Sequence, residues 1–101
     1  MSDKFINTII DTFVTDSGVM IQQLKELQIK PDNDLIYKSV HKLKSSCELF
    51  NISEIVKKAV SLEKYISNNK NIDDFLILSE LKEIIFLLEN AVKDIQNLIK
   101  I

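Results

Sequence analysis

The chain has 101 residues, which fits one domain and leaves little room for a second, so residues 1–101 are predicted to form a single domain. Hydrophobic residues make up 46% and charged residues 28%, a balance that excludes a disordered chain. The net charge is −2 and all 13 basic residues are lysines, so a nucleic-acid-binding surface is not expected. A single glycine excludes a glycine-rich nucleotide loop, and a single cysteine excludes an internal disulfide.

The first third of the chain carries apolar residues at three- and four-residue spacing, which predicts helix. A short extra helix is expected over residues 2–14. The segment 15–18, which holds the glycine, is expected to interrupt it as a break or a kink. A second helix should follow and end at Pro31, because the residue before proline avoids helical backbone angles.

Three further helices are predicted after Pro31, over residues 34–50, 52–66 and about 74–100. Asn51, between the first two, suits both a left-handed position after a helix and a cap before the next one. The predicted fold is an all-α antiparallel four-helix bundle with the short extra N-terminal helix. No apolar run exceeds five residues, and the N-terminus does not look like a signal peptide. A cytoplasmic protein without a membrane span is therefore expected.

His41, the only histidine, lies within the helix predicted over 34–50. The apolar residues of that helix fall within an arc of about 80° and are predicted to be buried, whereas His41 lies about 140° from the centre of that arc. His41 is therefore expected to face solvent, with Lys44 and Ser45 one turn further on and Glu48 as the only acid nearby. The apolar residues of the arc are Ile36, Val40, Leu43, Cys47 and Phe50.

The surroundings predicted for His41 suit covalent chemistry better than metal binding. A metal site would need further ligands, but this face offers tyrosine, serine and two lysines, so no metal is expected. An exposed imidazole is a competent nucleophile at neutral pH, and a lysine one turn away stabilises a phosphoryl group placed on it. Ser45 and Ser46 are small enough to let a partner approach the ring.

The segment from His41 to Asn51, HKLKSSCELFN, resembles the signature of histidine-containing phosphotransfer (HPt) domains. That signature is a histidine, two residues, a lysine, a glycine, a serine or alanine, a small residue, and a second glycine six positions after the first. The pair Leu62-Glu63 is similar to a Leu-Glu that commonly closes the next helix of the family. The resemblance implies a four-helix bundle that relays phosphate between receiver aspartates in two-component phosphorelays.

Carried over residue by residue, the resemblance makes His41 the phosphoacceptor and Lys44 the residue that stabilises the phosphoryl group. Ser46 matches the serine or alanine of the pattern. Ser45 and Asn51 replace its two glycines, and the serine could either hydrogen-bond the phosphoryl group or crowd the partner. The implied protein is a monomeric phosphocarrier, not an enzyme with turnover, and has no cofactor of its own. Its partners would be response-regulator receiver domains, which supply Mg²⁺, and a hybrid sensor histidine kinase.

Four residues are expected to help bind the partner: Phe13, Met20, Tyr37 and Glu48. For Phe13 and Met20, ordinary core packing is the alternative. The alternative function is a degenerate HPt-like bundle, or an unrelated helical adaptor or chaperone, that binds proteins without phosphorylation. A kinase dimerisation domain fits less well, because Lys42 follows the histidine and no proline comes after Pro31.

Overall fold

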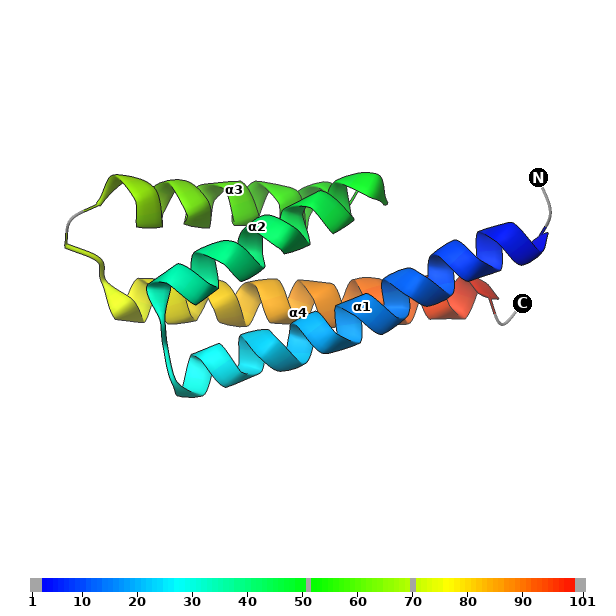
Figure 1. Cartoon of the computed structure of the whole chain (residues 1–101), viewed down its shortest axis with the longest axis horizontal. Coiled ribbons are helices and arrows are strands. Elements are labelled where there is room, and N and C mark those ends of the chain that lie inside the picture. The colour runs from blue at the N-terminus through cyan, green and yellow to red at the C-terminus, as the bar shows by residue number, and fades with distance from the viewer. Residues whose placement is uncertain (1–2, 51, 70, 100–101) are drawn as a thin grey trace.

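The computed structural model describes residues 3–50, 52–69 and 71–99. Within these ranges the chain forms α1 (Asp3–Ile29), α2 (Asn33–Leu49), α3 (Ser53–Asn68) and α4 (Asp74–Ile99) and contains no strand, which confirms the all-α prediction. The chain direction reverses at each connection in Figure 1. Each helix packs against two others, because α1 and α3 both contact α2 and α4.

Local signals set most of the helix boundaries. The Asp32 side chain accepts a hydrogen bond from the backbone N–H of Leu35 at 3.1 Å and so caps α2. At the far end of α2, the Ile52 N–H donates to the Cys47 carbonyl at 3.0 Å, the long-range bond of a Schellman-type ending. Asn51, predicted to cap and to adopt left-handed angles, lies outside the described residues, as does Ser2 at the start of the first predicted helix.

The predicted short extra helix at the N-terminus is not a separate element, because α1 runs without interruption from Asp3 to Ile29. Its buried stripe continues through the expected break, and the small Ser17 takes a buried position in that stripe. Gly18 faces open space, and one glycine in a helix costs only about 1 kcal/mol relative to alanine. Packing of one continuous face offsets that cost. The buried stripe of α1 is Phe13, Ser17, Met20, Leu24 and Leu27.

The hydrophobic core draws on all four helices and includes the predicted stripe of α2. Phe50, at the end of that stripe, is half-buried, and its ring centroid lies 4.3 Å from that of Phe13. This contact fixes the end of α2 against the middle of α1. The largest fully buried side chains of the core are Leu24, Ile36, Val40, Leu43, Cys47, Ile55, Ile77, Leu81, Ile84 and Leu88.

The four helices differ in length, so one end of the molecule contains only α1 and α4 (Figure 1). Helices α1 and α4 have 27 and 26 residues, whereas α2 and α3 have 17 and 16. Figure 1 shows the N-terminal part of α1 and the C-terminal part of α4 extending together beyond the end of the α2–α3 pair. None of the four described helices combines the length and the apolar character that a membrane-spanning segment requires.

Candidate functional site

His41 lies in the middle of α2 and faces outward, as predicted, with 58% of its side chain exposed. The opposite face of the same helix carries the buried stripe, so packing of that stripe fixes the direction in which the imidazole points. The Tyr37 ring, one turn earlier, lies nearly parallel to the imidazole, with an interplanar angle of 6° and 6.3 Å between centroids. Tyr37 is itself half-buried and flanks the histidine ring on that side.

A carboxylate from the next helix faces the inner nitrogen of the imidazole. Glu63 of α3 places Oε1 3.3 Å from His41 Nδ1, and only 12% of the Glu63 side chain is exposed. Oε1 is buried and accepts no hydrogen bond in the described part of the chain. Because buried carboxylate oxygens are normally hydrogen-bonded, a small rotation of the imidazole that aligns Nδ1–H with this oxygen would be favourable. The carboxylate thus favours the tautomer with its proton on Nδ1.

Lys44 contacts the same carboxylate through its other oxygen. Its Nζ donates to Glu63 Oε2 at 3.3 Å, and the lysine side chain is half-buried. The positive charge beside Glu63 compensates for the burial of the carboxylate, which would otherwise be costly. An ammonium group carries three donors, so Nζ keeps donors for a further acceptor beside His41. His41, Glu63 and Lys44 therefore form one cluster across the α2–α3 contact.

Glu63 is the member of this cluster that sequence reasoning missed as a site residue. The prediction that Glu48 is the only acid near His41 is wrong, because Glu48 lies exposed on α2 whereas Glu63 contacts the imidazole. A signal was present in the sequence. Glu63 directly follows Leu62 on the buried face of α3, with Ile55 and Ala59, and an acid in such a stripe needs a partner.

The two serines that follow His41 take different positions. Ser45 is exposed, and its Oγ donates to the His41 carbonyl at 3.5 Å, so its side chain lies along the outer surface of α2 one turn after the imidazole. Ser46 is half-buried and lines a groove on the other side of α2. Of the two, only Ser45 borders the solvent-facing surface around His41.

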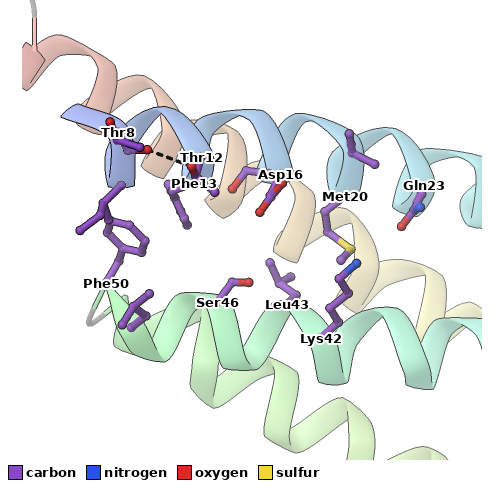
Figure 2. Close-up of a pocket in the computed structure, with 14 residues that line it drawn as sticks. Thr8, Thr12, Phe13, Asp16, Met20, Gln23, Lys42, Leu43, Ser46 and Phe50 are labelled. Atoms are coloured by element: carbon purple, nitrogen blue, oxygen red, sulfur yellow. Dashed lines mark hydrogen bonds between the residues drawn. The ribbon is translucent and has the colours of Figure 1, made fainter. Parts of the chain in front are cut away.

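A surface groove with a volume of about 400 Å³ lies between α1 and α2 and is lined by residues of both helices. Figure 2 shows Phe13 and Met20 pointing from α1 toward α2, with Leu43 and Phe50 pointing back. Both of the predicted partner-binding residues of α1 are buried side chains that form the floor of this groove. The groove and the Glu63 contact lie on opposite flanks of α2, so the structure does not bring Phe13 and Met20 together with His41.

The described part of the chain holds no group of three or more histidine, cysteine, aspartate or glutamate side chains placed to bind a metal. Cys47 is fully buried, as predicted from its place in the stripe, and burial raises its pKa to about 11. Its thiol is therefore protonated at neutral pH and serves as a small core residue.

Comparison with known families gives one match. A sequence model described as the Hpt domain matches residues 8–98, which cover all of α2 and α3, most of α1 and all but the last residue of α4. Comparisons with curated proteins and with solved structures give no match.

Proposed function

Because the chain belongs to the Hpt domain family, we propose that it is a phosphorelay protein that carries a phosphoryl group on His41, to and from receiver-domain aspartates. The observation that supports the proposal most directly is the exposed imidazole whose inner nitrogen faces a buried carboxylate. A proton held on Nδ1 leaves the lone pair of Nε2 free and directed away from the protein. Nε2 is then the nucleophile.

The proposed transfer is a direct displacement at phosphorus. Nε2 of His41 attacks the phosphorus of an aspartyl phosphate, an N–P bond forms, and the P–O bond to the aspartate breaks to release its carboxylate. The imidazole gains positive charge as the N–P bond forms, and Glu63 Oε1, 3.3 Å from Nδ1, stabilises that charge. Lys44 stabilises the negative charge of the phosphoryl group. The reverse displacement by a second receiver aspartate returns the histidine, so this chain is a carrier and not an enzyme.

The proposed receiver contacts surround His41. Tyr37 and Glu48 lie on the same side of α2 as the imidazole, and Ser45 gives a partner close access to the ring. A contribution of Phe13 and Met20 to receiver binding stays a prediction. It would require the receiver to enter the α1–α2 groove, because these two side chains form the floor of that groove. The proposal places the protein in the cytoplasm with a hybrid sensor kinase and receivers as partners, and it requires no nucleic acid or membrane.

Phosphorylation of the intact protein tests this function. We expect a small phosphoramidate, or a phosphorylated receiver from the same organism, to add one phosphoryl group that intact-mass measurement detects. The group should be labile in acid and stable in alkali, as a phosphohistidine is. A folded protein that takes no phosphate from competent receivers would contradict the relay, and the protein-binding adaptor would become the better explanation.

Replacing Glu63 with glutamine is expected to slow phosphoryl transfer on the order of tenfold, the result of losing about 1.4 kcal/mol of stabilisation in the transition state. Glutamine keeps the size and an acceptor for Nδ1–H but loses the negative charge that faces the imidazole. Rapid-quench measurement of transfer from a phosphorylated receiver gives the rate. Glu26→Gln removes an exposed acid from α1, away from the proposed receiver contacts, and should leave the rate unchanged. Equal rates in the two variants would rule out a role for the Glu63 charge.

Ser45→Leu is expected to reduce phosphorylation by a receiver but not phosphorylation by a small donor. The larger side chain would stand on the exposed surface one turn from His41, where it would obstruct a protein but not phosphoramidate. Transfer from the receiver should fall at least tenfold, an activation cost of about 1.4 kcal/mol or more, while phosphoramidate labelling stays near wild type. Ser79→Leu, at an exposed position of α4, is the control. A parallel loss with both donors would show instead that the substitution disturbs His41 itself.

A further inference from the structure

The four helices form two layers, and the two layers differ in charge. Helix α2 packs mainly on α3 and α1 mainly on α4, and Figure 1 shows these two pairs along opposite edges of the molecule. The α2–α3 layer carries six lysines and four acidic residues. The α1–α4 layer carries four lysines and nine acidic residues. The chain as a whole is slightly acidic, but its charges are therefore separated across the bundle.

Within the α2–α3 layer, positive charge gathers in the middle, where the exposed imidazole lies. Asp34 and Glu54 stand in the first turns of α2 and α3, and Glu48 stands in the last turn of α2. Because the chain direction reverses between the two helices (Figure 1), these three acids lie at the ends of the layer. Glu63 lies in the middle but is buried, and Lys44 faces one of its oxygens. The exposed charges in the middle of the layer therefore come from lysines.

Two of these lysines flank the contact between His41 and Glu63. Lys38 precedes His41 by three residues in α2, and Lys64 directly follows Glu63 in α3. Both side chains are exposed, and neither forms an ion pair within the ranges that the structure describes. No neighbouring acid compensates for their charges, so these charges act outward into solvent, over about 10 Å at 0.1 M ionic strength.

We propose that this charge separation steers a partner with an acidic face onto the α2–α3 layer and away from the α1–α4 layer. The inference rests on the proposed phosphorelay function and deepens it, because it names which receivers the site accepts: those whose surface around the aspartate is acidic. An aspartyl phosphate adds negative charge to such a surface. Steering of this kind raises association rates by roughly 10- to 1000-fold and weakens steeply as salt is added. Nucleic acid fits the layer less well, because α2 and α3 contain no arginine and acids lie at both ends.

Rapid-quench measurement of transfer from a phosphorylated receiver over a series of salt concentrations tests the steering. For the wild type we expect the second-order rate constant to fall about tenfold between about 0.02 M and about 0.5 M NaCl. Lys38→Glu combined with Lys64→Glu should lower that constant at least tenfold at the low salt concentration, and the difference should vanish at the high one. The rate at saturating receiver should stay within about twofold of wild type, because steering acts on encounter and not on the displacement itself.

Lys82→Glu combined with Lys93→Glu is the matched control. Both lysines are exposed on α4, and this pair of substitutions changes the net charge by the same amount. An effect of net charge alone would slow both variants equally, whereas steering predicts a loss only in the α2–α3 variant. Lys38→Gln combined with Lys64→Gln adds no acid beside the buried carboxylate, so it repeats the test if the first variant melts early. It should give about half of the loss on a logarithmic scale, because it changes half as much charge.

A second measurement reads the charge separation without any phosphorylation. Small nitroxides in solution relax the backbone amide protons that they approach, and their approach depends on the local potential. Carboxy-PROXYL, which is anionic, should relax amides of α2 and α3 more strongly than those of α1 and α4. Aminomethyl-PROXYL, which is cationic, should show the reverse preference. Equal relaxation of the two layers by both probes would overturn the proposal.

The transfer experiment can also overturn it. Equal losses in the two glutamate variants would reduce the effect to net charge, and wild-type transfer that does not change with salt would refute steering while leaving the phosphorelay function intact. Tight binding of duplex DNA that only the α2–α3 variant loses would assign the layer to nucleic acid instead. If no receiver phosphorylates the wild type, the phosphorelay function fails and this inference fails with it, whatever charge separation the nitroxides report.

Discussion

His41→Gln is expected to abolish phosphorylation completely, both by phosphoramidate and by a phosphorylated receiver. Glutamine has no nucleophilic nitrogen, whereas its amide can still donate a hydrogen bond to the Glu63 carboxylate. Since the His41 side chain is mostly exposed, its loss should change the free energy of unfolding by no more than about 0.5 kcal/mol. Intact-mass measurement gives the phosphate, and a thermal melt gives the stability.

Lys42→Gln is the matched control for that loss, because Lys42 is the exposed neighbour of His41 in the chain and lines the groove rather than the Glu63 cluster. It should accept phosphate like wild type. An acid-labile phosphate that persists on His41→Gln would place the acceptor elsewhere in the chain and would refute the assignment of the site.

Leu81→Ala is expected to destabilise the bundle by about 3–4 kcal/mol, the cost of losing a fully buried leucine side chain and leaving a cavity. Leu81 lies on α4, in a core to which all four helices contribute. For a domain of this size that loss corresponds to a fall of roughly 12–30 °C in the melting temperature. Thermal and urea unfolding followed by circular dichroism measure it.

Leu35→Ala makes the same chemical change at a half-exposed position of α2 and should cost less than about 1 kcal/mol. If the two variants melt at similar temperatures, Leu81 does not occupy the buried core position described for it. The pair therefore checks the packing independently of any measurement of phosphorylation.

The sequence predicted those features of the fold that depend on nearby residues. Asp32 and Pro31 set helix ends within a residue or two of their predicted positions, and the spacing of the α2 stripe correctly placed His41 on the outside. The continuous α1 could not be predicted from local signals. The run Thr15-Asp16-Ser17-Gly18 consists of residues that are common in turns and at helix ends, so it suggests an interruption. What keeps the helix intact is packing against α2 and α4 on both sides of the expected break, where Phe13, Ser17 and Met20 are buried, which is a long-range effect.

The candidate site was only half predictable for the same reason. His41, Lys44 and Ser45 follow one another on a single helix, so their mutual positions follow from helical geometry. Glu63 reaches His41 only because α3 packs on α2 in one register, and no periodicity within either helix specifies that register. An acid within a buried stripe shows that a partner is required, but it does not show which residue the partner is.

The location of the cluster on α2 and α3 has a consequence for the order in which contacts form during folding. These helices are consecutive and joined by a short connection, so bringing Glu63 to His41 closes a small loop, whereas pairing α1 with α4 joins the two ends of the chain. The entropy cost of closure rises with the length of the loop. The contacts that orient the imidazole therefore belong to the locally connected half of the bundle, and the α1–α4 pairing that closes the molecule carries the larger cost.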